Sequence, residues 1–256
     1  MTWPRVVYYR DLLRELVLRD MRIRYKRSAL GFAWSLANPL MYLAVFYFVF
    51  QTALAIDIPR FGLFALTGIL VWGWFQTSLS QSAGAIVGSR ELVRSPGFIP
   101  AILPVVTVTS GLVHFLVALG LLLIFLLVFG DGLGYQALVL PLLMTLQFLL
   151  TLSLAYLIAA VNVAFRDTGH LVSVVLQLMF FLTPIFYDAS MVPAQYQLLY
   201  RLNPMVHLIE AYRSAVLHAS PLHWEPLVTI ALISLVLLVI GHRIFLRLSY
   251  RFAEEI

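Results

Sequence analysis

The sequence has little charge for its length. Of its 256 residues, 11% are charged, against about 25% in a typical soluble domain. Hydrophobic residues make up 62% of the chain, and the mean hydropathy is +0.94. A soluble globule of 28.9 kDa needs more polar surface than this composition supplies. The composition therefore indicates a polytopic membrane protein, in which each crossing needs about 20 apolar residues.

Cysteine is absent and lysine occurs once, and each shortage excludes classes of function. Without cysteine there is no disulfide, thiol nucleophile or thiolate metal site. The single lysine, Lys26, does not follow a glycine. The sequence therefore lacks the G-x-x-x-x-G-K-[ST] loop that holds the phosphates of ATP. We also expect no cleavable signal peptide, because the first 33 residues are densely charged and no small-residue cleavage site follows the first apolar run.

Groups for ion coupling and catalysis are also scarce. Only His114 is titratable deep inside an apolar run, and we interpret it as a histidine bonded to a neighbouring helix. Ion-driven carriers need ionisable groups or broken-helix ion sites near the membrane midplane. No H-E-x-x-H or G-x-S-x-G motif occurs, and His207 with Glu210 is an isolated H-x-x-E pair. The sequence therefore disfavours both an ion-driven carrier and catalysis by this chain alone.

Apolar runs predict six membrane-spanning helices. They are Ser35–Ile56, Phe61–Ile86, Ile102–Phe129, Gln136–Ala164, Leu171–Phe186 and Pro226–Phe245. The fifth run is short and reaches the Thr183-Pro184 dipeptide, so it either stops before the far face or continues as a bent helix. We predict an all-α polytopic membrane protein with one transmembrane domain over residues 1–256. Its parts are an interface helix within 1–33, spans one to five within 35–186, re-entrant helices within 187–225, and span six with its tail in 226–256.

Basic residues predict which way the chain threads the membrane. Eight of the 17 precede the first span and six more lie on the same side, whereas only Arg60, Arg201 and Arg213 lie on the other. Basic residues accumulate on the cytoplasmic face, so we expect both termini in the cytoplasm. The net charge of +5 then reflects topology and anionic headgroups, and nucleic acid is not an expected partner.

The segment before the first span is amphipathic. Over residues 6–24, apolar side chains recur at helical spacing opposite an arginine-rich face. Two pairs, Glu15–Arg19 and Asp20–Arg24, have the i,i+4 spacing of helical ion pairs. We expect a helix lying in the membrane interface with its arginines at headgroup level. The alternative is a solvated cytoplasmic tail.

The segment 187–225 should connect the last two spans outside the membrane, yet one helical face of it is apolar. Glu210 and Arg213 lie on the opposite, polar face. Lipid tolerates backbone that does not span only where protein or a water-filled cavity covers it. We therefore expect short re-entrant helices, broken at Pro193 and at Asn203-Pro204.

Aromatic and neutral polar side chains are concentrated in the spans. Tyr42, Phe46 and Phe50 have the spacing i, i+4, i+8 and share one stripe of the first span. The remaining candidates are Gln76, Ser80 and Gln81 in the second span and Phe180 and Phe181 in the fifth. Sugar rings present flat C–H faces that pack against aromatic rings, so this set suits a carbohydrate path. Ordinary helix packing and interfacial aromatic belts are the alternatives.

The connection over residues 88–100 predicts a short cytoplasmic knob of one or two helical turns before Pro96. It would expose Arg90, Glu91 and Arg94 beside Leu92 and Val93, and Ser95 completes the set that we predict for coupling. A knob with such an apolar pair suits docking to a partner protein, whereas a solvated connection needs no apolar pair.

Several ordered blocks together resemble one family. The entry block is LRDMRIRYKRSALGFAW over residues 18–34, followed by Asn38-Pro39. Further blocks are Phe165-Arg-Asp167, Thr183-Pro-Ile-Phe-Tyr187 with Pro193, Asn203-Pro204, Tyr212-Arg213 and Tyr250-Arg-Phe-Ala-Glu254. In order and spacing these blocks resemble the type-2 ABC exporter permeases, which move lipid-linked polysaccharides (O-antigen) or polyol phosphates (teichoic acids). The chain ending over 250–254 is similar to the O-antigen branch.

The resemblance implies a homodimer of six-span permeases in the bacterial cytoplasmic (inner) membrane. Two copies of a separate nucleotide-binding ATPase subunit would bind Mg-ATP, and no cofactor or metal is expected in this chain. The cargo would be an undecaprenyl-linked polysaccharide, moved through a channel between the protomers and in contact with membrane lipids.

The resemblance also assigns roles to segments of this chain. Residues 89–96 correspond to the helix that couples to the ATPase. Ser95 and Ala101 stand where family members often carry lysine or arginine. The external gate would include Pro193, Asn203, Pro204, Glu210 and Arg213. At the cytoplasmic interface, the residues that we expect to attract the phosphates of the lipid headgroup are Arg19, Arg22, Arg24, Lys26 and Arg27.

Other functions stay open at this stage. A teichoic acid or capsule exporter, and a drug or small-lipid ABC permease, share the predicted architecture. A passive pore or scaffold without an ATPase and a membrane-embedded glycan-modifying enzyme belong to different classes.

Overall fold

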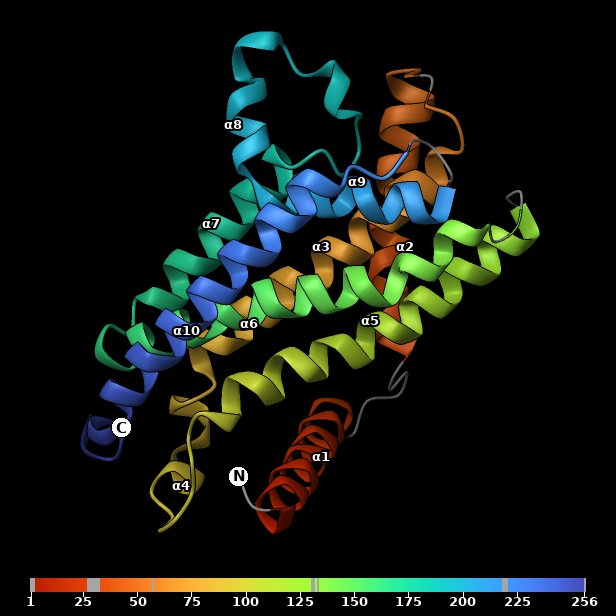
Figure 1. Cartoon of the computed structure of the whole chain (residues 1–256). Helices are drawn as coiled ribbons and strands as arrows, with labels where there is room; N and C mark the ends of the chain where they lie inside the picture. The colour runs from red at the N-terminus through yellow and green to blue at the C-terminus, as the bar shows by residue number, and fades with distance from the viewer. Residues whose placement is uncertain are drawn as a thin grey trace.

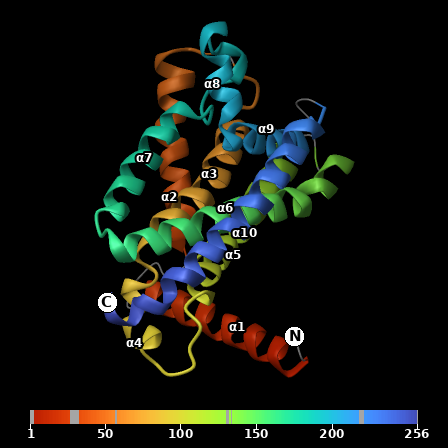
Figure 2. The same cartoon turned by 60° about the vertical axis from the view of Figure 1, so that its left-hand side comes forward.

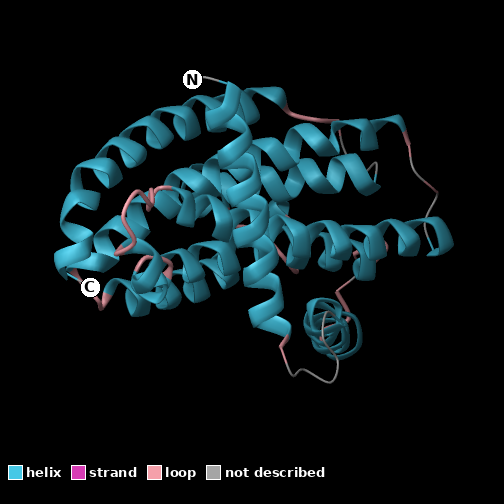
Figure 3. Ribbon diagram, turned by 90° about the horizontal axis from the view of Figure 1, so that it is seen from below, coloured by secondary structure: helices cyan, strands magenta, loops and turns pink. Residues whose placement is uncertain are grey.

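The computed structural model describes residues 3–26, 33–56, 58–129, 132, 134–217 and 221–255. Its long helices are α1 (Trp3–Tyr25), α2 (Trp34–Tyr47), α3 (Phe61–Gly84), α5 (Ile102–Phe129), α6 (Leu140–Ala164), α7 (Thr168–Leu182), α9 (Pro204–Leu217) and α10 (Trp224–Glu255). The short ones are a π-helix η2 (Phe48–Ala53), the 3-10 turns η3 (Val87–Ser89), η4 (Tyr135–Val139), η5 (Ala189–Met191) and η6 (Ala194–Tyr196), and the helices α4 (Arg90–Val93) and α8 (Gln197–Leu202). Within these ranges every regular element is a helix, as Figure 3 shows. The all-α prediction is confirmed.

Five helical stretches are long and apolar enough to cross a membrane, so the chain is a polytopic membrane protein. They are Trp34–Ala53, Phe61–Gly84, Ile102–Val128, Tyr135–Ala164 and Trp224–Tyr250. The remaining predicted span is α7, which has 15 residues and ends at Leu182. Thr183 takes an extended conformation (φ −91°, ψ 137°) because it precedes Pro184. The fifth apolar run therefore stops at this break.

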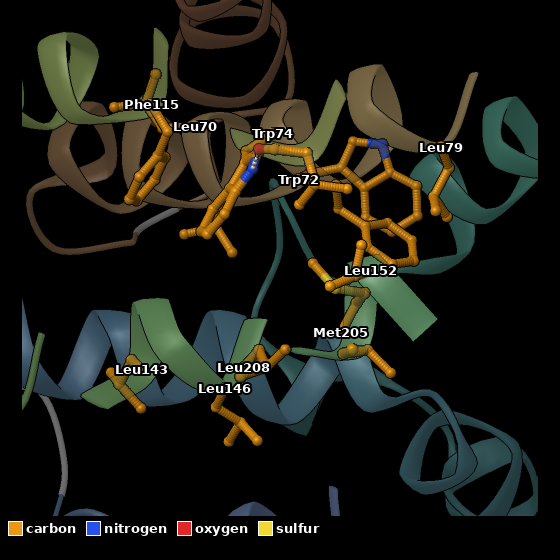
Figure 4. Packing of buried hydrophobic residues seen from close by; sticks show 14 of the residues in the cluster. Leu70, Trp72, Trp74, Leu79, Phe115, Leu143, Leu146, Leu152, Met205 and Leu208 are labelled. Atoms are coloured by element: carbon orange, nitrogen blue, oxygen red, sulfur yellow. Dashed lines mark hydrogen bonds between the residues drawn. The ribbon is translucent and has the colours of Figure 1, made fainter. Parts of the chain in front are cut away.

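Helix α3 forms the centre of the bundle. It packs against α2, α5, α6, α7 and α9, and most of its side chains are buried. Trp74 stacks on Phe115 of α5, with ring centroids 5.1 Å apart, and donates its indole N–H to the carbonyl oxygen of Val108 at 3.2 Å. Figure 4 shows this packing together with Leu208 of α9. Because α3 has no charged residue and is mostly apolar, it is suited to a position enclosed by protein.

Close helix contacts depend on two glycines. Gly241 brings α10 against α6, where an added Cβ would lie 2.9 Å from the backbone oxygen of Ser153. Gly111 of α5 does the same against α3, where an added Cβ would collide with the Ser78 hydroxyl. Small residues of this kind let membrane helices approach closely and gain dispersion contacts that lipid cannot supply.

The bundle has two distinct ends, which are visible in Figures 1 and 2. One end carries α1, α4 and the C-terminal end of α10, and we call it the α1–α4 end. The other carries α8 and α9, and we call it the α8–α9 end. The substrate-sized cavities described below lie between them.

Helix α1 is longer than the predicted amphipathic segment and packs against α5. Its apolar face is covered by protein, since Leu16 and Val17 are buried. The Asp20–Arg24 ion pair forms at 3.1 Å. The other predicted pair, Glu15–Arg19, does not close to 4 Å among the described residues. The helix is therefore docked on the bundle by its apolar face and keeps most of its charges outward.

The predicted breaks in the segment 187–225 are present. Pro193 separates η5 from η6, and α8 ends where Asn203 takes an extended conformation before Pro204. The Asn203 side-chain oxygen accepts a hydrogen bond from the Met205 N–H at 3.0 Å, which caps α9. Its amide nitrogen donates to the Thr183 hydroxyl at 2.9 Å. Asn203-Pro204 thus starts α9 and ties it to the end of α7.

Candidate functional site

Two adjoining cavities lie between α2 and its neighbours. The aromatic cavity, of about 580 Å³, is bounded by α2, α3 and α7. The polar cavity, of about 400 Å³, is bounded by the end of α1 with α2, α3 and α5. Their shared walls are Asn38, Pro39, Ile69, Gly73 and Thr77. Both volumes fall in the range of about 300–1,000 Å³ that is typical of ligand sites.

The aromatic cavity brings together seven of the eight residues that we predicted for a substrate path. They are Tyr42, Phe46, Gln76, Ser80, Gln81, Phe180 and Phe181. The eighth, Phe50, lies outside the cavity on the π-helix. The structure adds wall residues that we did not predict for this path: the five shared with the polar cavity, and Trp72, Ser173 and Gln177. Helical spacing alone indicates that Gln177 shares a face with Phe181 and Ser173 on α7.

The lining of the aromatic cavity is neutral and partly polar. None of the described residues that line it is an Asp, Glu, Lys or Arg. The Gln76 side-chain oxygen accepts a hydrogen bond from the Trp72 indole at 2.9 Å, which orients both groups along the wall. Such a surface can stack on the apolar faces of a ligand and exchange hydrogen bonds with its hydroxyl groups.

Four phenylalanines pack together where the aromatic cavity meets the C-terminal ends of α2 and α7, and we call them the aromatic seal: Phe46, Phe50, Phe180 and Phe186. Phe46 and Phe186 stack with ring centroids 3.6 Å apart. Phe50 joins them, 6.0 Å from Phe186. Phe186 is only 3% exposed. It was not among our site predictions, because the turn that brings it to Phe46 is a tertiary feature.

The polar cavity joins α1 to the spans. Arg24 donates to Asp20 at 3.1 Å and to the side-chain oxygen of Gln81 at 2.7 Å. The Tyr25 hydroxyl is hydrogen-bonded to Nδ1 of His114 at 3.0 Å, which confirms His114 as a histidine bonded to a neighbouring helix. Burial raises the pKa of Tyr25, while the Arg24 charge acts in the opposite direction. The neutral phenol is thus the form present in this contact.

The predicted headgroup residues divide into two groups. Arg19, Arg22 and Lys26 are exposed on α1. Arg24 instead turns inward and lines the polar cavity. Arg27 lies outside the described residues. Arg24 therefore places a cation in the wall of the polar cavity, hydrogen-bonded to Gln81 of the aromatic cavity.

The predicted short helix between the second and third spans forms as α4, and its apolar pair faces the bundle. Arg90, Glu91, Arg94 and Ser95 are exposed. Val93 is only 8% exposed, and half-buried Leu92 packs against the same core. The Leu92-Val93 pair thus faces the bundle, on which the single turn of α4 rests. Its outward surface is polar and charged.

Arg213 lies in a different place from the one we predicted. We expected it on the polar face of its helix, yet it is 5% exposed. Its guanidinium donates to the carbonyl oxygens of Pro184 at 2.8 Å, Ile185 at 2.7 Å and Phe64 at 3.3 Å, and lies 3.4 Å above the Phe64 ring. Arg213 therefore satisfies the backbone that the break after α7 leaves open, and joins α9 to α3 there.

The remaining predicted gate residues lie around the same end. Pro193 is exposed between the two 3-10 turns, and Asn203 with Pro204 forms the start of α9. Glu210 is half-buried on α9. Burial raises the pKa of Glu210, and the nearby His207 and Arg213 oppose this shift. Its carboxyl group therefore carries a desolvation cost when ionised.

The sequence matches a known family over most of its length. The model of the family described as "ABC-2 type transporter" matches residues 11–217. The chain is similar to "O-antigen export system permease protein RfbA" of Myxococcus xanthus (36% identity over 97% of this chain and 96% of the relative) and to the protein of the same name in Klebsiella pneumoniae (31%, over 96% and 95%). It is also similar to "Polysialic acid transport protein KpsM" of Escherichia coli (26%, over 94% and 92%).

Proposed function

Because the chain belongs to the ABC-2 type transporter family, we propose that it is the permease subunit of an ATP-driven exporter of lipid-linked polysaccharide, with O-antigen as the cargo. The relatives named as O-antigen permeases match nearly the whole chain at 30–36% identity. The aromatic cavity is the observation that carries the assignment. It offers ring faces and neutral hydrogen-bonding groups in an uncharged cavity that lies between the two ends of the bundle.

The neutral lining favours O-antigen over a polyanionic capsule. Polysialic acid, named for the E. coli relatives, carries a carboxylate on every residue. A polyanion passing through an uncharged, low-dielectric wall would lose hydration without a cationic partner. Export of a capsular polysaccharide is therefore the second candidate, and export of teichoic acid comes after it.

We assign the α1–α4 end to the cytoplasm, because 14 of the 17 basic residues belong to that side of the sequence. Both termini are then cytoplasmic, and the membrane is the inner membrane. Arg19, Arg22 and Lys26 attract the pyrophosphate of an undecaprenyl carrier at the interface. Arg24 stands at the entrance through which the glycan passes toward Gln81 and the aromatic cavity.

The energy comes from a separate ATPase, two copies of which hold Mg-ATP beneath a homodimer of this chain. Two observations support this arrangement. The chain has no phosphate-binding loop of the G-x-x-x-x-G-K-[ST] kind, and α4 presents Arg90, Glu91 and Arg94 outward at the α1–α4 end. The protomers pair through α2 and α7, whose exposed side chains include Tyr42 and Phe181 beside the cavity. The channel then runs between the two copies.

The α8–α9 end is the external gate in this scheme. The aromatic seal closes the path, and Arg213 holds the backbone on which Phe186 stands. Movement of α4 by the ATPase shifts the spans and parts the seal.

The proposal is tested by deleting the gene and restoring it on a plasmid. We expect the deletion strain to lose surface polysaccharide and to accumulate lipid-linked polymer inside the cell, and the restored gene to reverse both. Immunoblots and mass spectrometry of the lipid-linked fraction measure the two pools. Unchanged surface polymer in the deletion strain would refute the assignment, and an accumulated drug or simple lipid would indicate another ABC cargo.

A further inference from the structure

A third hollow lies at the α8–α9 end, apart from the two cavities between the spans. It has a volume of about 780 Å³ and is bounded by the segment around α8, by α9 and by the first turn of α10. These three parts of the chain lie together in Figure 2. No residue is shared between its walls and those of the aromatic cavity. It is thus a separate site of ligand size.

Aromatic rings form part of its wall. Trp224 begins α10 and has 52% of its surface exposed. Tyr200 contributes a second ring from α8. A half-exposed indole at the rim of a hollow offers a large, rigid face with a polar edge, which is the surface that apolar faces of sugars stack on.

The polar groups of the hollow include both donors and acceptors. Glu210 and Glu225 supply carboxylate oxygens, and Arg201 supplies guanidinium N–H groups. His207 is held in place by a 2.8 Å hydrogen bond between Nε2 and the backbone oxygen of Arg201. A ligand rich in hydroxyl groups can use both kinds, since each hydroxyl donates and accepts.

The same mixture argues against other ligands. An anion would face the two carboxylates. A metal ion lacks a suitable set, because no group of three or more His, Asp or Glu side chains among the described residues is placed to hold one. A neutral or weakly charged saccharide remains the ligand class that fits.

A short chain of contacts connects this hollow to the aromatic seal. The hydroxyl groups of Tyr200 and Tyr187 are 2.8 Å apart. Tyr187 directly follows Phe186, whose ring stacks on Phe46 at 3.6 Å. The wall formed by Tyr200 therefore lies next to the aromatic seal.

We propose that this hollow is an exit subsite that binds a short segment of the exported glycan outside the membrane. The proposal rests on the function and orientation proposed above. Trp224 provides the stacking surface, and the carboxylates with Arg201 and His207 bond the hydroxyl groups. Binding there retains the emerged segment while the seal closes behind it.

The test uses the full transporter, this chain with its ATPase, in lipid nanodiscs. The probe is the surface polysaccharide of the source bacterium, freed of lipid by mild acid and labelled at one end, and fluorescence anisotropy measures its Kd. We expect Trp224→Ala to weaken binding about tenfold, as loss of an aromatic contact would, and Trp224→Phe to retain most of the affinity. Glu225→Gln, at an exposed position, should weaken binding severalfold without altering the fold.

Tyr196→Ala is the matched control, because Tyr196 is an exposed aromatic residue of the same segment but lies outside the hollow. It should bind like the wild type. The inference is overturned if the wild type fails to bind the free polymer, or if both Trp224→Ala and Glu225→Gln bind as tightly as the wild type. Export by the restored wild-type gene then decides whether the proposed function stands without this subsite. A loss of binding in Tyr196→Ala equal to that in Trp224→Ala would also contradict the exit subsite.

Discussion

At the scale of single residues, Arg213 has a structural role that its predicted place on a polar helix face did not indicate. Its buried guanidinium donates hydrogen bonds to three carbonyl oxygens. Two of these belong to the break at Pro184, where no helical N–H group is available to them. Arginine suits this task because its planar fork presents several N–H groups in fixed directions, whereas lysine has one compact ammonium.

We therefore expect Arg213→Lys to lower stability by about 2–4 kcal/mol, because at least one buried carbonyl loses a charged donor. Thermal unfolding of the purified transporter in nanodiscs measures the change. Arg201→Lys is the control, since Arg201 is exposed on α8 and should melt like the wild type. Equal melting temperatures for the two variants would show that the Arg213 contacts add nothing.

Glu210 predicts a pH dependence. Burial raises the pKa of Glu210 above its ordinary value of 4.5. The protonated side chain therefore favours the folded state below pH 4.5, and this stabilisation is lost as the pH rises through the pKa of the folded state. Glu210→Gln should thus melt at a higher temperature than the wild type at pH 7 and at the same temperature near pH 4. Melting curves across this range measure the difference. A variant that is less stable at pH 7 would contradict the assigned sign.

At the scale of elements, the positions of the spans follow from the apolar runs because a bilayer imposes their length. The stripe of Tyr42 and Phe46 likewise follows from the period of a helix. Which side of α4 faces the bundle could not be predicted from the sequence. A helix of one turn is too short to show a hydrophobic period, so the pattern does not say which way Val93 points. The contact of Arg24 with Gln81 joins residues 57 positions apart, which no local pattern encodes.

The interface between α10 and α6 gives a prediction of its own. Gly241→Ala should destabilise the protein by about 1–3 kcal/mol, because the new methyl group meets the backbone oxygen of Ser153 and neither helix can yield cheaply. Gly120→Ala on α5 meets nothing within 4 Å and should be neutral or slightly stabilising through helix propensity. Thermal unfolding of both variants measures the contrast, and equal losses would contradict close packing at Gly241.

At the scale of the whole molecule, the proposed function requires energy to travel from the α1–α4 end to the aromatic seal. In that proposal the polar outer side of α4 contacts the ATPase, and Val93, which is buried, links α4 to the core. Arg90→Glu with Arg94→Glu should leave ATP hydrolysis by the partner largely intact while surface polysaccharide falls at least tenfold, because reversed charges repel the docking surface.

ATPase assays on the purified complex and immunoblots of surface polymer measure the two effects. Arg10→Glu, an exposed change on α1, should leave export near the wild-type level. Normal export by the double variant would show that α4 does not couple the ATPase to export.

The π-helix at the C-terminal end of α2 affects how this segment can move. Its hydrogen bonds reach back five residues, as from the Leu54 N–H to the Val49 oxygen at 2.9 Å. If this stretch changes to α-helical geometry, each N–H group bonds to the carbonyl oxygen one residue closer along the chain. No peptide group then lacks a hydrogen-bond partner inside the membrane. Phe50 can thereby rotate away from Phe186 while the helix stays continuous, so the movement needs no flexible loop.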